Sequence, residues 1–272
     1  MKDRIDSVLV RKGYFETRQK AKYAIENDCI YVDDKLVQKP SKMIDEEASI
    51  EVKGDVLPFV SRGGLKLAKA ISSFDIKLKD KVCMDIGAST GGFTDCMLQN
   101  GASKVYAVDV GHDQLSESLK KDNRVINLEG TNIRQIETEE FGKLDFISID
   151  VSFISLTQVI DKAYELLKDS GEMVTLIKPQ FEAGKEYINK NGVVKDKKIH
   201  EKVIEKIILF ANSLQFEILA LDYSPIKGPA GNIEYLLYLK KKNEKESLEI
   251  FSKREQIKQI VEKAHKELKN KE

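Results

Sequence analysis

The chain begins with apolar residues at helical spacing, followed by short runs of strand-forming residues. Two short amphipathic helices are expected first, with Gly13 placed to end one and Thr17 placed to cap the other. The residues that carry this pattern are Ile5, Val8, Leu9, Ala21, Ala24 and Ile25 in the helices, and Ile30–Val32, Leu36–Val37 and Ala48–Val52 in the strands. A small α+β domain is therefore predicted over residues 1–57, and the Pro- and Gly-containing stretch 58–64 is predicted to be a linker.

From residue 65 onward, apolar strands alternate with amphipathic helices. This alternation is typical of an α/β fold with a doubly wound, Rossmann-like parallel sheet, and we expect it to fill residues 65–242. The last strand follows its predecessor after a Gly- and Pro-containing turn, so it is expected to be antiparallel. The predicted strands are Val82–Ile86, Lys104–Val108, Val125–Leu128, Phe146–Asp150, Met173–Ile177, Glu217–Leu221 and Glu234–Leu239, with helices such as Phe93–Asn100, Ser155–Leu167 and Ile199–Leu214 between them.

Residues 243–272 are dominated by Lys and Glu. Leu248, Phe251, Ile257, Ile260 and Val261 recur there at roughly helical spacing, which predicts a charged, solvated helical tail.

Composition narrows the class of protein without naming a function. Hydrophobic residues make up 41% and charged residues 33% of the 272 positions, and the formal net charge is zero, so any basic surface must be local. The three cysteines lack metal-ligand spacing, and the three histidines are scattered. No apolar run is long enough to cross a bilayer. We expect a cytoplasmic, monomeric protein that needs no metal and no membrane.

A glycine-rich loop between a predicted strand and a predicted helix is the first candidate site. The run Asp85–Thr94 contains glycines that let a ligand approach the backbone, and a branched side chain at Gly91 is expected to occupy ligand space. The spacing is neither GxGxxG nor a P-loop, and Asp109 ends the next strand, where it can accept hydrogen bonds from a ribose. A nucleoside ligand without a pyrophosphate, such as S-adenosylmethionine, fits this pattern. Alternatively, the glycines only allow tight strand–helix packing, and Ser89 and Thr94 only cap the helix.

Several further motifs give the chain a specific resemblance. It resembles FtsJ-type RNA methyltransferases, and in detail the TlyA family (historically "hemolysin A"), which pairs such a domain with an αL RNA-binding domain. The resemblance implies the cofactor S-adenosylmethionine, bound by Asp85, Gly87, Ser89, Gly91, Gly92, Thr94, Asp109, Asn132 and Asp150. The motifs that carry it are Asp85–Asp95, Ala107–Gly111, Asp150–Leu156, Lys178–Glu182 and Gly228–Glu234.

The resemblance also implies a catalytic Lys-Asp-Lys-Glu tetrad at Lys66, Asp150, Lys178 and Glu234. Asp150 and Lys178 lie at the carboxyl ends of strands expected to be adjacent, beside the crevice where doubly wound sheets bind ligands. Apolar surroundings and a nearby Lys66 are expected to lower the pKa of Lys178, so that its amine can act as a base. The competing interpretations are that Lys66 faces water, that Lys69 takes its place, or that Glu234 is an ordinary surface carboxylate.

Positive charge gathers near the N-terminus, where Met1–Ala24 holds seven Lys or Arg residues and three acids. A solvated helix face is the usual explanation of such charge. The resemblance instead implies an RNA-binding surface formed by Arg4, Arg11, Lys12, Arg18, Lys20 and Lys22. The chain departs from the family where Gly and Asn-Gly are usual, since Asp28-Cys29 and Asp33-Asp34 stand there.

The activity implied by the resemblance is 2′-O-methylation of cytidine in ribosomal RNA within ribosomal subunits, on the large subunit and, for longer members, on the small one. Two alternatives come from other classes: a non-catalytic rRNA-binding assembly factor, and a membrane-active hemolysin, for which the chain lacks an apolar segment. A pseudouridine synthase is disfavoured by the glycine-rich loop. The sequence does not say which nucleotide or subunit is modified.

Overall fold

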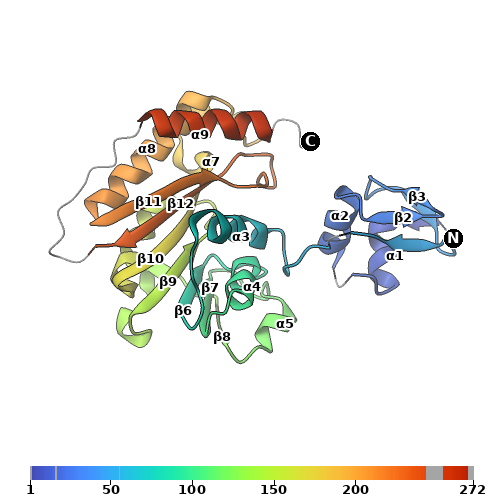
Figure 1. The fold of residues 1–272 in the computed structure, drawn as a ribbon, viewed down its shortest axis with the longest axis horizontal. Coiled ribbons are helices and arrows are strands. Elements are labelled where there is room, and N and C mark those ends of the chain that lie inside the picture. The colour runs from blue at the N-terminus through green and yellow to red at the C-terminus, as the bar shows by residue number, and fades with distance from the viewer. Residues whose placement is uncertain (1, 16, 55, 243–253, 269–272) are drawn as a thin grey trace. The chain divides into compact units, whose positions relative to one another are not determined.

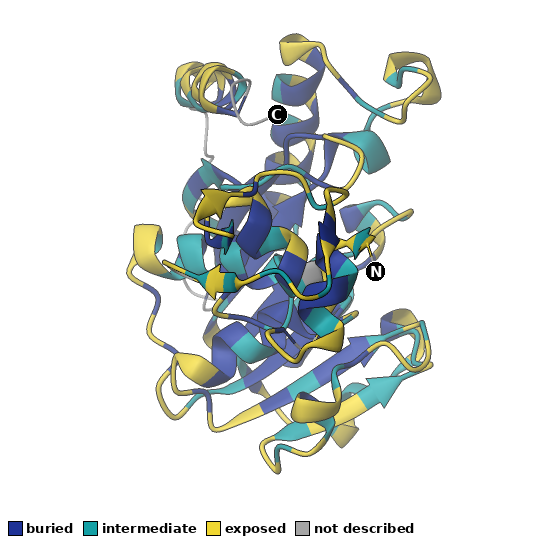
Figure 2. Ribbon diagram, turned by 90° about the vertical axis from the view of Figure 1, so that its right-hand side faces the viewer, coloured by how far each residue is buried: buried dark blue, intermediate teal, exposed yellow. Residues whose placement is uncertain are grey.

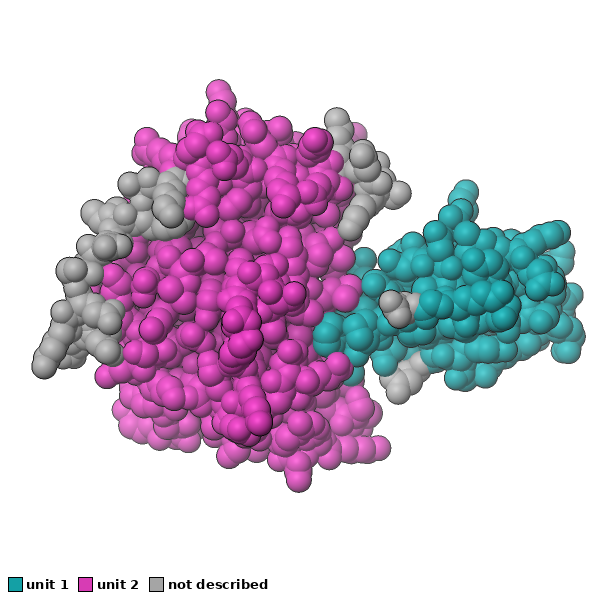
Figure 3. Space-filling view, in the orientation of Figure 1, with its two compact units in different colours: residues 1–62 teal, residues 63–272 magenta. Residues whose placement is uncertain are grey.

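The computed structural model describes the chain except for residues 1, 16, 55, 243–253 and 269–272. It divides into two compact units, Met1–Arg62 and Gly63–Glu272, which Figure 3 distinguishes by colour. The division lies inside the stretch 58–64 in which we expected a linker.

The first unit is a small α+β domain with its own core. Helices α1 and α2 pack against each other, and the side chain of Thr17 caps α2 by accepting from the Lys20 amide at 3.2 Å. The hairpin turn at Asp33-Asp34 has φ angles of 49° and 61°, a left-handed conformation that Asp tolerates better than most residues. The elements are β1 (Lys2–Arg4), α1 (Ile5–Arg11), α2 (Arg18–Glu26), β2 (Ile30–Val32), β3 (Lys35–Leu36), β4 (Met43–Asp45) and β5 (Ile50–Val52), with strand pairs β1–β4 and β3–β2–β5.

The second unit is built on a seven-stranded sheet in the order β11-β12-β10-β9-β6-β7-β8 (Figure 1). The α/β doubly wound fold is confirmed, and the last strand is antiparallel as expected. That strand, β12, is inserted between β10 and β11 and is antiparallel to both. The strands are β6 (Val82–Ile86), β7 (Lys104–Asp109), β8 (Val125–Glu129), β9 (Leu144–Ile149), β10 (Leu167–Ile177), β11 (Phe216–Tyr223) and β12 (Tyr235–Lys241).

Helices cover the sheet and keep its central strands away from solvent, as the dark blue strands of Figure 2 show. Helix α3 packs against α4 and contacts β12, whereas α6 contacts β10 and α8 contacts β11. The helix predicted over Ser155–Leu167 is broken into a 3-10 turn and a shorter α6, and Leu167 already starts β10. The helical elements are α3 (Gly63–Phe74), α4 (Gly92–Gln99), α5 (Glu117–Lys120), α6 (Ile160–Leu166), α7 (Pro179–Glu182), α8 (Lys197–Ser213) and α9 (Arg254–Glu267), with 3-10 turns at Ile133–Gln135, Thr138–Glu140, Leu156–Gln158 and Lys185–Tyr187.

The expectation of a solvated tail is wrong for its described part. Helix α9 packs on α8 and β11, and Ile257, Val261 and Ala264 join the core of the unit. Leu248 and Phe251 lie outside the described residues. Within the described part of the chain, no helix is both long and apolar enough to span a membrane.

Candidate active site

Three of the four tetrad residues lie just outside strand ends on one edge of the sheet. Asp150 follows β9, Lys178 follows β10, and Glu234 precedes β12, whose first residue pairs with Ile177. Because β9 and β10 are parallel neighbours and β12 is antiparallel to β10, these three positions meet at the same edge.

The fourth residue, Lys66 on α3, completes a row of alternating charges. Its Nζ lies 2.8 Å from Glu234 Oε2 and 3.3 Å from Asp150 Oδ2, and Lys178 Nζ lies 2.6 Å from Asp150 Oδ1. The side chains of Lys66 and Glu234 are only 8% and 1% exposed, so neither is a solvated surface group. Lys69, the competitor for the role of Lys66, instead pairs with Asp222 at 3.0 Å.

The electrostatics of this row keep its middle members charged. Burial alone would raise the pKa of Asp150, but the ammonium groups of Lys66 and Lys178 outweigh it and hold that pKa below its ordinary value. Burial likewise opposes the charge on Lys66, yet Asp150 and Glu234 together raise its pKa. Asp150 is therefore a carboxylate and Lys66 an ammonium near neutral pH. The expected lowering of the Lys178 pKa stays a prediction.

Residues that the sequence reasoning gave no role surround Lys178. Its Nζ donates to Ser152 Oγ at 2.9 Å. The next residue, Phe153, has a φ of 64° and is 91% exposed, and its ring centroid lies 5.0 Å from that of Phe181. A left-handed φ on a bulky residue is uncommon and marks a backbone held by its surroundings. The motif around Asp150 was visible in the sequence, but this conformation was not.

Glu182 holds the loop that carries Ser152 and Phe153. Its side chain is 1% exposed, accepts from Ser155 Oγ at 2.8 Å and from the Leu156 amide at 2.6 Å, and pairs with Lys206 at 3.0 Å. Because a buried carboxylate is stable only when it is well paired, these contacts fix the loop relative to α7 and α8. Its position in the run Lys178–Glu182 was the only sequence signal for it.

A cavity of about 430 Å³ opens beside the tetrad at the ends of β6, β7 and β9. Asp109 lies in its wall, and its carboxylate accepts from the amides of Ser89 and Gly111 at 2.8 Å each, which fixes the carboxylate in place. Of the expected cofactor residues, the cavity wall includes Gly87, Ser89, Asp109, Asn132 and Asp150. The other lining residues include Ile86, Val108, Val110, Gln114, Ile133, Val151, Ser152, Phe153 and Ile154.

The remaining expected cofactor residues, Asp85, Gly91, Gly92 and Thr94, are not in that wall. Asp85 is fully buried and accepts from the amide and hydroxyl of Thr94 at 2.8 and 2.7 Å, which fastens the start of α4. Burial raises the pKa of Asp85 to about 7. At Gly91, whose φ is 95°, a Cβ would meet the side chain of Leu119, and that of Leu115 at 2.8 Å, so packing within the protein already favours glycine there. That a side chain at Gly91 would also occupy ligand space stays a prediction.

Of the N-terminal cations expected to bind RNA, the three arginines form ion pairs within the first unit, and the three lysines differ in exposure. Arg4 and Arg18 both pair with Asp6, at 3.0 and 2.6 Å, and they hold its pKa at about 2 against the effect of burial. Arg11 pairs with Asp3 and Glu46. Lys12 and Lys22 are exposed, and Lys20 is half-buried. A cavity of about 450 Å³ in this unit is lined by Arg4, Asp6, Arg18, Lys22, Tyr23, Glu26 and Arg62.

Comparison with known proteins gives matches over almost the whole chain. Residues 59–241 match the FtsJ-like methyltransferase model, and residues 3–50 match the S4 domain model. A Bacillus subtilis protein provisionally named as an rRNA methyltransferase, YqxC, is 46% identical over 99% of this chain and 96% of its own length. The 16S/23S rRNA (cytidine-2′-O)-methyltransferase TlyA of Mycobacterium tuberculosis is 37% identical over 87% of this chain and 89% of its own. A solved structure from Streptococcus thermophilus, provisionally named a hemolysin, is 45% identical with a TM-score of 0.77, covering 98% of this chain and 97% of its own.

Proposed function

The chain belongs to the TlyA family of FtsJ-like methyltransferases that carry an S4 domain, and we propose that it methylates the 2′-hydroxyl of cytidine in ribosomal RNA with S-adenosylmethionine. The observation that carries this proposal is the buried row Glu234–Lys66–Asp150–Lys178 at the mouth of a nucleoside-sized cavity.

The cavity has the chemistry that this cofactor needs. Its volume lies in the range of small-molecule sites, and its aliphatic wall suits an adenine ring. The fixed carboxylate of Asp109 can accept hydrogen bonds from ribose hydroxyls, and Asp150 lies in the same wall and also in the tetrad. When bound, the cofactor supplies an electrophilic methyl group.

Within the tetrad, Lys178 is the residue proposed to accept the proton of the 2′-hydroxyl, a role that requires its Nζ to give up its own proton first and react as a neutral amine. Asp150 and Ser152 hold its Nζ from two sides, at 2.6 and 2.9 Å. Lys66 stays an ammonium between Asp150 and Glu234, so it orients Asp150 and does not compete for the proton. Loss of the hydroxyl proton leaves the ribose oxygen as the nucleophile.

Two features of the described chain suit an RNA substrate. The exposed ring of Phe153 lies in the wall of the cofactor cavity and offers a face on which a nucleobase can stack. In the first unit, Lys12 and Lys22 are exposed cations on or beside α1 and α2, suited to phosphate contacts. Arg4 and Arg18 are proposed to contribute to the same surface, although both also stabilise Asp6.

The deciding experiment is methyl transfer from tritiated S-adenosylmethionine to ribosomal subunits purified from a strain lacking the gene. We expect metal-independent transfer, with label mapping to the ribose of a cytidine; separate assays on large and small subunits give the specificity. Cofactor binding without transfer to either subunit would favour an assembly factor, and dye release from liposomes without transfer would favour a hemolysin.

The RNA surface needs its own variants. Reversing Lys12 and Lys22 to Glu should weaken rRNA binding and flatten its salt dependence, while cofactor affinity stays as in the wild type. Arg18→Glu is a poor choice, because it would place a second carboxylate against the buried Asp6 and unsettle the fold. Wild-type rRNA affinity in the Lys12/Lys22 double variant would remove these residues from the surface.

A further inference from the structure

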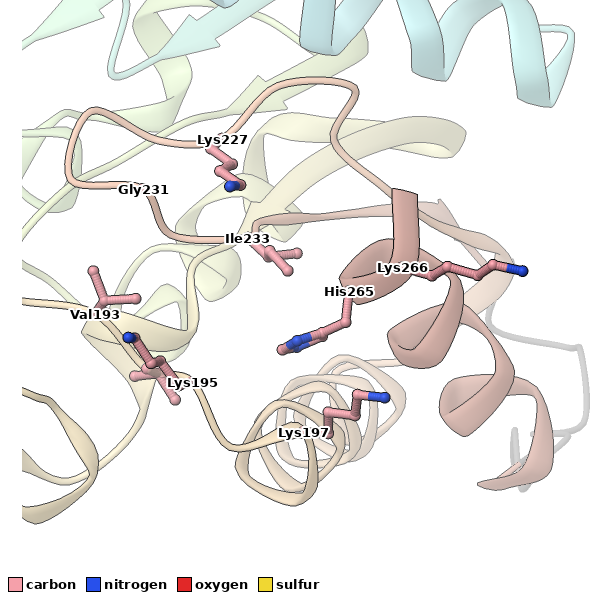
Figure 4. Close-up of a pocket in the computed structure, with 9 residues that line it drawn as sticks. Val193, Lys195, Lys197, Lys227, Gly231, Ile233, His265 and Lys266 are labelled. Carbon is pink, nitrogen blue, oxygen red and sulfur yellow. The ribbon is translucent and has the colours of Figure 1, made fainter. Parts of the chain in front are cut away.

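A second cavity, of about 570 Å³, lies beside residues 228–234, the loop that leads to Glu234, on the side away from the tetrad. Figure 4 shows the ring of His265 pointing into the space between Lys195, Lys227 and Ile233. The walls come from the segment before α8, the loop between β11 and β12, and the end of α9. The lining residues are Val193, Val194, Lys195, Lys197, Lys227, Gly231, Ile233, His265 and Lys266.

The charge of this cavity is entirely positive among the described residues that line it: four lysines and no acid. The nearby acid Asp196 is engaged as the cap of α8, where it accepts from the Lys198 amide at 2.8 Å. Lys195 and Lys197 flank the start of this helix, where the helix dipole disfavours cations. Burial, with His200 and Lys197 nearby, lowers the pKa of His265 to about 4, so the ring stays neutral at pH 7. Bound anions would offset the repulsion among these lysines.

The cavity is tied to the active site through one short loop. Asn232 is 2% exposed; its Oδ1 accepts from the Val194 amide at 3.1 Å, and its Nδ2 donates to the Gly192 carbonyl at 2.9 Å. Ile233 then lines the cavity, and the following residue, Glu234, pairs with Lys66. Both sites therefore lie at the same edge of the sheet, on either side of residues 228–234.

We propose that this lysine cavity binds backbone phosphates of the RNA strand that presents its 2′-hydroxyl to the tetrad. The inference rests on the proposed function and adds to it a second RNA contact, located in the catalytic unit. Ammonium groups at the rim suit phosphate oxygens, and the aliphatic floor of Val193, Val194 and Ile233 suits the sugar between two phosphates.

The test compares two triple variants that remove the same charge. One replaces Lys195, Lys197 and Lys227 by Gln. The matched control replaces Lys79, Lys104 and Lys121, three exposed lysines that line neither this cavity nor that of the cofactor. Binding to deproteinised large- and small-subunit rRNA is measured as a function of salt. Each lost phosphate contact removes about 0.7 from the slope of log K against log salt, so the cavity variant should lose about 2 and the control about 0.

A second arm separates RNA from free phosphate compounds. Calorimetric titration of the wild type with inorganic phosphate and with AMP should show no saturable binding in the millimolar range. Equal slopes in the two triple variants would overturn the proposal. If, in addition, inorganic phosphate bound saturably to the wild type and not to the cavity variant, the cavity would be a site for free phosphate compounds instead of RNA. Thermal melts confirm that both variants are folded. Failure of the proposed function has a different signature, since the wild type itself would then transfer no methyl group.

Discussion

Replacement of Lys178 separates a chemical role from a structural one. In Lys178→Ala, Asp150 loses its contact at 2.6 Å but keeps Lys66 at 3.3 Å. Removing one partner of a buried ion pair typically costs about 3–5 kcal/mol. Because Asp150 keeps a second cation, we expect a smaller loss of roughly 1–2 kcal/mol, which lowers the melting temperature by about 2–8 °C for a unit of this size.

The rate of methyl transfer should fall strongly even though the variant stays folded. Loss of a general base slows the chemical step by about a hundredfold or more, equivalent to roughly 2.7 kcal/mol of barrier. The assay is single-turnover methyl transfer at saturating cofactor, with calorimetry of S-adenosylhomocysteine to confirm that the cofactor site is intact. Lys66→Ala is the structural comparison: it leaves the buried carboxylates of Asp150 and Glu234 without the cation between them, and should lower the melting temperature more than Lys178→Ala.

Lys178→Arg decides the issue. Arginine keeps a cation beside Asp150, so stability should stay near that of the wild type, but its guanidinium cannot accept a proton at working pH. The Arg variant should therefore be as slow as the Ala variant. Activity within tenfold of the wild type would refute the base assignment and make Lys178 a fixed charge that orients the hydroxyl.

Three further changes test the surroundings of the site. Gly91→Ala should lower the free energy of unfolding by about 1–3 kcal/mol, through its left-handed φ and a steric clash, and so lower the melting temperature; unchanged stability with lost cofactor binding would favour the ligand-space interpretation. Glu182→Gln should reduce kcat roughly tenfold, about 1.4 kcal/mol, and leave cofactor affinity intact, and an unchanged kcat would show that the loop needs no such anchor. Because burial raises the pKa of Asp85 to about 7 from 3.8, the folded state holds a proton that the unfolded state releases, and stability is lost as pH rises from about 4 through 7. Asp85→Asn should thus melt progressively higher relative to the wild type between pH 5 and pH 8.5, and a pH-independent difference in melting temperature would contradict the raised pKa.

The strands could be predicted because they depend on the local apolar pattern, whereas the tetrad positions came from the family resemblance of the motifs that carry them. Strands β9 and β10 end at Ile149 and Ile177, within one residue of the ends that the apolar pattern predicts, and Asp150 and Lys178 directly follow these ends. The burial of Lys66 could not be predicted, since a lysine on an amphipathic helix usually faces water and only β12 brings Glu234 to it.

Other features depended on packing that one sequence does not reveal. Asp85 and Thr94 lie in the glycine-rich motif expected to bind the cofactor, yet the Thr94 hydroxyl donates a hydrogen bond to the Asp85 carboxylate. The left-handed backbone of Phe153 leaves no compositional trace. The burial of the tail helix was not predicted because its few apolar residues are separated by many charged ones, although Val261 and Ala264 are completely buried.

The insertion of β12 between β10 and β11 affects how the protein folds while it is being synthesised. Lys66 is synthesised before strands β6 to β11, and its partner Glu234 only after them. Until then the nascent polypeptide can form the cofactor loop but not the charge row, and β10 lacks one hydrogen-bonded neighbour. A nascent chain that stops short of Glu234 therefore lacks one member of the charge row, and the row can form only after β12 has been synthesised.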